Sequence, residues 1–134
     1  MKIKRILFVC VENAGRSQMA EAFAKNYGKK GFIFSSAGTN PSDEINPTVV
    51  LAMKEKGIDV SKNKPNPLTH KMIQNSDLII TMGCGAKGIC VGPLSISTID
   101  WKIEDPKNKS LEKIRSIRDE IEQRVKNLIV EQTG

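Results

Sequence analysis

The stretch KRILFVCVENAGRSQMAEAFAKNYG, residues 4–28, places a strand, a short loop and a helix in direct succession. Residues 4–10 form a predicted strand whose apolar part, residues 6–10, is continuous, as is typical of a strand buried on both faces of a parallel sheet. Beyond the loop that follows Cys10, apolar residues recur at helical spacing until Gly28 ends the pattern. A buried strand that leads through a short loop into a helix predicts an α/β fold.

The rest of the chain repeats this alternation of strands and helices. Further strands are predicted at residues 31–38, 76–83 and 94–99. Further helices are predicted from Asn46 to Gly57, from Thr69 to Asn75, and from Ser110 onward. Helices between the strands predict a doubly wound, mostly parallel sheet. Because no linker or repeat interrupts the chain, we expect a single catalytic domain over residues 1–134.

Composition and charge limit the partners. The chain has 21 Lys+Arg against 15 Asp+Glu, a net charge of +6, but its basic residues are scattered and only 4% of residues are aromatic. This pattern does not favour nucleic acid, and a small oxyanion suits the same charge. No apolar run approaches the ~20 residues of a membrane span. The N-terminus reads as a strand rather than a signal peptide, so we expect a cytoplasmic protein without membrane attachment.

The loop after Cys10 has the features of an anion site. In open α/β sheets, ligands bind beyond the carboxyl ends of the strands, where Cys10 lies. The helix that starts at Arg16 presents free N–H groups and the positive end of its dipole, which favour an anion and also a thiolate. Arg16 offers a planar fork to a tetrahedral oxyanion, and Ser17 can donate a hydrogen bond to the cysteine sulfur. The predicted oxyanion-binding residues are Val11, Glu12, Asn13, Ala14, Gly15, Arg16 and Ser17.

This C-x5-R-S pattern has a simpler alternative, namely a buried cysteine at a strand end beside a surface arginine. The simpler interpretation would suffice for either residue alone, but the combination at a strand-to-helix junction favours chemistry. The loop also lacks the G-x-x-x-x-G-K-[ST] pattern of a nucleotide-binding loop. We therefore predict Cys10 as a nucleophile, with Arg16 and Ser17 assisting it.

A thiolate that displaces an oxygen needs a proton donor for the leaving group. The candidate is Asp105, which precedes Pro106 in the loop after the fourth predicted strand, at the same edge of the sheet as Cys10. A role in turn formation alone is the alternative for Asp105. Asp100 and Glu104 are close to it in the sequence and could be confused with it.

The other two cysteines are Cys84 and Cys90, and an odd total of three argues against a static disulfide framework. Cys84 ends the third predicted strand, and Cys90 follows across a glycine-containing tether. Inert apolar cysteines are one alternative. Zinc held by the cysteines and His70 is another, but the spacing and the single histidine disfavour it. We expect His70 to face solvent and no metal to be bound.

The loop VCVENAGRSQMAEAF, residues 9–23, resembles the phosphate-binding loop of the low-molecular-weight protein tyrosine phosphatases. It is still more similar to that of the arsenate reductases that share their fold. Further matching stretches follow in family order: SSAGT (35–39), NPTVVLAMKEKGIDVS (46–61), SDLIITMGC (76–84), EDPKNKS (104–110) and RDEIEQRVKNLI (118–129). The resemblance implies a three-layer fold with a four-stranded parallel sheet and helices on both faces.

The resemblance also implies roles for particular residues. Asp105 would be the general acid in either group of enzymes. Phosphatases of this fold usually carry aromatic residues after the Asp-Pro pair to hold a phosphotyrosine ring, whereas DPKNKS (105–110) has none, which favours a reductase. In the implied scheme Cys10 attacks arsenate, Cys84 attacks Cys10 as arsenite leaves, and Cys90 attacks Cys84. Thioredoxin or a glutaredoxin-like dithiol protein would then reduce the final disulfide, and no cofactor is expected.

Two departures from the relatives bear on the loop. Some relatives hold a potassium ion near it; Asn13 and Ser36 match and are expected to support the loop, but the adjoining stretch SKNKPNP (61–67) differs, so the sequence leaves potassium binding open. Glu12 places a negative charge within the anion loop, and we expect it to point outward.

Two other functions stay open at this point. A low-molecular-weight phosphatase would hydrolyse phosphate monoesters through a phosphocysteine at Cys10. It needs Cys10, Arg16 and Asp105 but neither of the other thiols. An oxyanion-binding or sensing domain would use the same loop without turnover, but a nucleophile paired with an acid favours an enzyme.

Overall fold

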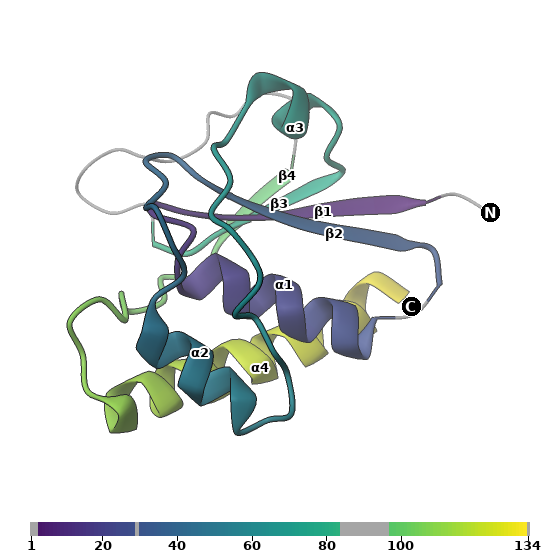
Figure 1. Cartoon of the computed structure of the whole chain (residues 1–134). Coiled ribbons are helices and arrows are strands. Elements are labelled where there is room, and N and C mark those ends of the chain that lie inside the picture. Colours follow the sequence, from purple (N-terminus) through teal and green to yellow (C-terminus); the bar gives the residue numbers. More distant parts are fainter. Residues whose placement is uncertain (1–2, 29, 84–96, 134) are drawn as a thin grey trace.

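The computed structural model describes residues 3–28, 30–83 and 97–133. Four parallel strands form one sheet, β1 (Lys4–Cys10), β2 (Phe32–Gly38), β3 (Leu78–Thr81) and β4 (Ser97–Asp100), in the order β2-β1-β3-β4 (Figure 1). The predicted four-stranded parallel sheet is confirmed. β1 lies between β2 and β3, so the carboxyl ends of the first and third strands are neighbours. The start of the fourth predicted strand, residues 94–96, lies outside the described residues.

The helices cover both faces of the sheet, as predicted, but unequally. They are α1 (Arg16–Tyr27), α2 (Pro47–Lys54), α3 (His70–Gln74) and α4 (Leu111–Thr133). Figure 1 shows α1, α2 and α4 below the sheet and the short α3 above it. Within the described part of the chain, no helix is long and apolar enough to cross a membrane.

The two faces of β1 contribute to two cores of different size. Ile6, Phe8 and Cys10 belong to the large cluster that α1, α2 and α4 complete. Leu7 and Val9 belong to a small cluster beneath α3. Because side chains alternate along a strand, Cys10 emerges on the helix-rich face, at the strand end that leads into α1. The buried strand predicted from the sequence thus positions the cysteine.

Predicted caps begin three helices. The side chain of Asn46 accepts a hydrogen bond from the N–H of Thr48 at 2.9 Å, and Pro47 is the first residue of α2. Thr69 caps α3 and Ser110 caps α4 in the same way. The predicted end of α2 at Gly57 was wrong by one turn. The N–H groups of Lys56 and Gly57 bond three residues back, so the helix tightens into a turn after Lys54.

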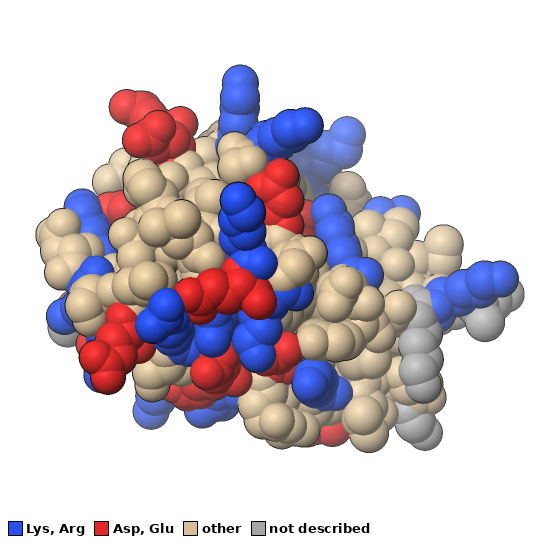
Figure 2. Space-filling view, turned by 60° about the horizontal axis from the view of Figure 1, so that its bottom comes forward, with Lys and Arg blue, Asp and Glu red and all other residues tan. Residues whose placement is uncertain are grey.

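Charges of both signs alternate on the face formed around α2 and α4, as Figure 2 shows. Glu55 there accepts hydrogen bonds from Arg115 and Arg118, and Lys56 pairs with Glu122 at 3.1 Å. The view shows no continuous basic field on this face, in keeping with the scattered basic residues of the sequence.

Candidate active site

The loop between β1 and α1 is shaped by hydrogen bonds of its main chain. Its carbonyls at Cys10, Val11, Glu12 and Ala14 accept from the N–H groups of Thr39, Asn40, Ser42 and Asn46, at 3.2, 2.8, 3.1 and 2.9 Å. In a trans peptide the C=O and the next N–H point in opposite directions, so the N–H groups of residues 11, 12, 13 and 15 face the other way. The N–H of Asn13 lies 3.2 Å from the Cys10 sulfur. The loop therefore forms a cradle of backbone donors, which suits an anion.

Gly38, at the end of β2, allows this loop to lie close. A Cβ on Gly38 would sit 2.6 Å from the carbonyl oxygen of Val11 and 2.9 Å from the nitrogen of Asn13. Both contacts are with backbone and are too short for a side chain. Glycine is therefore required here because two backbone segments approach each other.

The Cys10 sulfur receives two donors, and the network settles their direction. Asn13 accepts from the backbone N–H of Asn66 at 2.8 Å, which identifies the accepting atom as Oδ1. Its Nδ2 therefore faces Ser17 and donates to Oγ at 2.6 Å. Because Ser17 accepts there, its own proton is free to point at the Cys10 sulfur, 2.8 Å away. The backbone N–H of Asn13 and the hydroxyl of Ser17 therefore both point at the Cys10 sulfur.

Asn13 itself has a special backbone conformation, with φ of 51°. This left-handed geometry is the one that asparagine tolerates better than most residues, as the sequence suggested. The side chain of Asn13 is fully buried, so its three hydrogen bonds form away from water.

Arg16 lies with only 8% of its surface exposed. Its Nη1 donates to the carbonyl oxygens of Met82 at 2.5 Å and Ile103 at 2.9 Å. These two carbonyls come from the segments that follow β3 and β4, and they fix the plane of the guanidinium. Nη2 lies 4.0 Å from Oδ2 of Asp105. The arginine thus joins the segments after β3 and β4 to the loop around Cys10.

Asp105 lies beside the loop on the segment that leads to α4. The backbone N–H of Lys107 donates to its Oδ1 at 3.0 Å, and its side chain is 58% exposed. Pro106 packs against Gly15 so closely that a Cβ on Gly15 would meet the proline Cγ at 2.7 Å. The proline next to the acid is therefore in direct contact with the anion loop.

A pocket of about 20 Å³ brings the predicted residues together. It is lined by Cys10, Glu12, Ala14, Gly15, Arg16, Asn46, Asp105, Pro106 and Lys107. This is room for one small group, since about one water-sized sphere occupies 10–15 Å³. None of the described residues that line it is aromatic. The predicted nucleophile, arginine and acid therefore meet around a space that suits a small anion.

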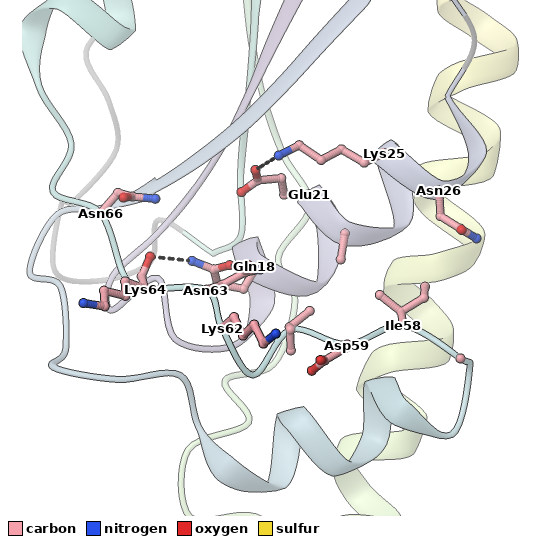
Figure 3. A pocket seen from close by; sticks show the side chains of 13 residues that line it. Gln18, Glu21, Lys25, Asn26, Ile58, Asp59, Lys62, Asn63, Lys64 and Asn66 are labelled. Atoms are coloured by element: carbon pink, nitrogen blue, oxygen red, sulfur yellow. Dashed lines mark hydrogen bonds and ion pairs between the residues drawn. The ribbon is translucent and has the colours of Figure 1, made fainter.

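A larger, open pocket of about 720 Å³ lies behind the loop, between α1 and residues 57–66 (Figure 3). Gln18, which is almost fully buried, links this side to the loop. Its Nε2 donates to Asn13 Oδ1 at 3.0 Å and to the carbonyl oxygen of Lys64 at 3.2 Å. The sequence analysis missed Gln18, although a polar residue directly after Ser17, amid buried positions, was a usable signal. The backbone N–H of Asn66 left no such signal.

Of the two residues matched to a potassium site in some relatives, Asn13 accepts from protein donors and Ser36 donates to a protein acceptor. Asn13 Oδ1 accepts from Gln18 and Asn66, and the Ser36 hydroxyl donates to Glu21. Glu21 also pairs with Lys25 at 2.6 Å (Figure 3). Ser36 reaches the loop only indirectly, through its carbonyl, which accepts from Asn66 Nδ2 at 3.4 Å.

Glu12 turns to the mouth of the small pocket, where its Oε2 lies 2.9 Å from Nζ of Lys107. The hydrogen bond with Glu12 and the charge of Glu12 raise the pKa of Lys107. The outward direction expected for Glu12 is thus observed, and its cationic partner was not anticipated. An acidic residue in an anion loop is the signal that could have prompted a search for a neutralising lysine.

The remaining predicted chemical residues are Cys84, Cys90 and His70. Cys84 and Cys90 lie outside the described residues, which end at Gly83 on this side. His70 is exposed, as expected. Among the residues that the structure describes, no group of three or more His, Cys, Asp or Glu side chains gathers to hold a metal ion.

Residues 5–133 match the family described as low molecular weight phosphotyrosine protein phosphatase. The chain belongs to that family, in agreement with the resemblance seen in its sequence. A curated relative, the glutaredoxin arsenate reductase of Synechocystis sp., is 37% identical over 130 residues, which cover 95% of this chain and 97% of the relative.

Solved structures with the same fold include arsenate reductases and an arginine phosphatase. An arsenate reductase in the phosphate binding state is 36% identical with a TM-score of 0.85, and the match covers 96% of this chain and 98% of that one. A thioredoxin-dependent arsenate reductase from Corynebacterium glutamicum is 38% identical with a TM-score of 0.79. That match covers 95% of this chain and 60% of the Corynebacterium chain. The YwlE arginine phosphatase from Geobacillus stearothermophilus is 28% identical with a TM-score of 0.87, covering 97% and 93% of the two chains.

Proposed function

We propose that this chain reduces arsenate to arsenite through a relay of cysteine thiols, Cys10 followed by Cys84 and Cys90. Thioredoxin or a glutaredoxin-like dithiol protein then restores the thiols. The observation that carries the proposal concerns the Cys10 sulfur. It accepts two hydrogen bonds and lines a pocket with room for one small anion. The similarity to arsenate reductases over nearly the whole chain supports it. A cytoplasmic location and the absence of a nucleic-acid partner stay predictions.

The first step follows from the geometry of the pocket. The Cys10 thiolate attacks arsenic, an arsenic–oxygen bond breaks, and Asp105 supplies a proton so that water leaves. The N–H groups of the loop and Arg16 stabilise the charge on the remaining oxygens. The product is a sulfur–arsenic(V) adduct at Cys10.

The second stage is the redox step. Cys84, next in sequence to Gly83 at the end of β3, attacks the Cys10 sulfur. A Cys10–Cys84 disulfide forms, and the electron pair of the sulfur–arsenic bond stays on arsenic, which leaves as arsenite. Cys90 then attacks Cys84, releasing the Cys10 thiolate and leaving a Cys84–Cys90 disulfide. The external dithiol reduces that disulfide by exchange, so two electrons pass from the donor to each arsenate.

The second candidate is hydrolysis of phosphate monoesters through a Cys10 phosphocysteine. The fold shared with an arginine phosphatase favours it, as do Cys10, Arg16 and Asp105 around one pocket. This chemistry uses neither Cys84 nor Cys90, so those two residues distinguish the candidates.

The test is steady-state arsenate reduction with thioredoxin, thioredoxin reductase and NADPH, and in parallel with glutaredoxin and glutathione. Wild type is compared with Cys84→Ser, Cys90→Ser and Cys10→Ser, and aryl-phosphate hydrolysis is measured beside it. We expect each substitution to abolish arsenate turnover, and only Cys10→Ser to abolish hydrolysis. Brisk hydrolysis without arsenate turnover in wild type would overturn the reductase and leave the phosphatase.

A further inference from the structure

Glu12 and Lys107 form an ion pair across the mouth of the catalytic pocket. Glu12 comes from the loop after β1 and Lys107 from the segment between β4 and α4, and their side chains meet at 2.9 Å. Lys107 also holds the acid, because its backbone N–H donates to Asp105. One residue thus closes the pocket with its side chain and orients Asp105 with its main chain.

The pair stands between two hollows. On its inner side is the pocket of about 20 Å³ that contains Cys10 and Arg16. On its outer side is an open groove of about 310 Å³ whose lining includes Ser42, Pro47 and Asn108. Glu12 and Lys107 line both hollows, as do Ala14 and Asn46. Breaking the pair would therefore remove a side-chain contact that the inner pocket and the outer groove share.

The two kinds of substrate place different demands on this pair. A free tetrahedral oxyanion has no organic group, so the pair can re-form once the anion is inside. The side chains of Lys107 and Glu12 are 59% and 34% exposed, and partly exposed pairs of this kind open readily. An ester bound at Cys10 must extend its organic group through the mouth. The organic group would hold Glu12 and Lys107 apart. The Glu12 carboxylate would then lie unpaired beside the negative charge of the ester's phosphate.

We propose that the Glu12–Lys107 pair is a specificity determinant that admits free inorganic oxyanions to Cys10 and rejects phosphate esters. The proposal rests on the oxyanion chemistry proposed above for the same site and names its substrate class. The discrimination between inorganic oxyanions and phosphate esters is thereby assigned to a contact at the mouth of the pocket. Phosphatases that hold an aromatic ester need an open cleft at this place.

The experiment compares wild type with the double variant Glu12→Ala/Lys107→Ala, which opens the mouth without changing the net charge. A charge-swapped variant, Glu12→Lys/Lys107→Glu, keeps a pair at the mouth. The control is Lys113→Ala, which breaks a pair of similar length with Glu104, at 3.0 Å, away from the inner pocket. For each protein we measure kcat/KM for p-nitrophenyl phosphate and the inhibition constant of inorganic phosphate in the same assay.

We expect the double variant to gain roughly tenfold in kcat/KM for the aryl ester, the scale on which one pocket feature discriminates substrates. Its inhibition constant for inorganic phosphate should stay within about threefold of wild type, because the cradle and Arg16 are intact. The charge-swapped variant should keep the selectivity of wild type, and so should Lys113→Ala.

Three results would overturn the proposal. The first is an unchanged ratio of ester turnover to phosphate affinity in the double variant. The second is an equal change of that ratio in Lys113→Ala. The third is a loss of phosphate inhibition in the double variant, since the pair would then build the site rather than select for it. Arsenate reduction is assayed separately on the same proteins, so failure of the reductase proposal leaves this ratio readable.

Discussion

Asn13 Nδ2 donates a hydrogen bond to Ser17 Oγ at 2.6 Å, and this contact fixes where the serine proton points. A hydroxyl that accepts from one side donates most readily on the other, where the Cys10 sulfur lies at 2.8 Å. The orientation of Asn13 depends in turn on Gln18 and on the backbone N–H of Asn66. The reactivity of the cysteine is therefore set by a chain of contacts that begins behind the loop.

The substitution Asn13→Ala should slow the alkylation of Cys10 by iodoacetamide at neutral pH by roughly tenfold, because the side chain that directs the Ser17 proton towards the sulfur is lost. Measurement in a Cys84→Ser/Cys90→Ser background makes the rate report on Cys10 alone. Asn40→Ala is the matched control, since Asn40 contacts the loop through its backbone N–H and its side chain is exposed. Equal rates for wild type and Asn13→Ala would contradict the assigned direction of the network.

Gln18→Leu keeps the size of the side chain but removes its hydrogen bonds to Asn13 and Lys64. The loss of these two hydrogen bonds should lower the free energy of unfolding by about 1–2 kcal/mol. A positioning role predicts in addition a slower alkylation of Cys10. Ile121→Val, a core change with a cost of about 1 kcal/mol, is the control for stability alone. If both variants alkylate at the wild-type rate, Gln18 contributes only to stability.

Gly15→Ala should separate the acid from the anion loop, because the new Cβ would clash with the ring of Pro106 at 2.7 Å. The proline must shift and carry Asp105 with it. We expect the kcat of aryl-phosphate hydrolysis to fall by roughly tenfold, because general acid catalysis is impaired. The inhibition constant of phosphate should change little, because the cradle is kept. Ala14→Gly, which removes a side chain next to Gly15, serves as a comparison. A loss of phosphate inhibition instead would mean that the loop itself had been distorted.

The ionised carboxylate of Glu55 contributes to the free energy of unfolding, and this contribution is lost at acid pH. Hydrogen bonds from Arg115 and then from Arg118 lower the pKa of Glu55 from 4.5 to about 2. A folded-state pKa below the unfolded value stabilises the fold above pH 4.5, and this contribution is lost as the pH falls towards about 2. Glu55→Gln should therefore lose less stability than wild type over that interval. Urea unfolding between pH 5 and pH 2 checks this, with the exposed Glu131→Gln as control.

Local features of the sequence predicted the strands and the caps. The apolar run before Cys10 and the Asn46-Pro47 start of α2 act on their own neighbours, so their signal is contained in a few residues. The end of α2 was misplaced because Gly57 terminates the turn after the helix rather than the helix.

Contacts between distant segments could not be predicted in the same way. Lys107 and Glu12 meet only because β1 and the segment after β4 end at one edge of the sheet, and neither residue has a local pattern. Gln18 and Lys64 likewise come together through the fold. Backbone donors such as the N–H of Asn66 carry no side-chain signature at all, so only the structure reveals their role.

The main-chain contacts that shape the loop have a consequence for how this site can change over generations. Its carbonyls are held by the backbone of residues 39–46, so the cradle does not depend on the side chains of Val11, Glu12 or Ala14. Mutation at those positions can alter which molecules reach the sulfur while the sulfur keeps its reactivity. The range of substrates and the reactivity of the sulfur therefore depend on different atoms of the same short loop. Evolution can change the range of substrates without loss of that reactivity.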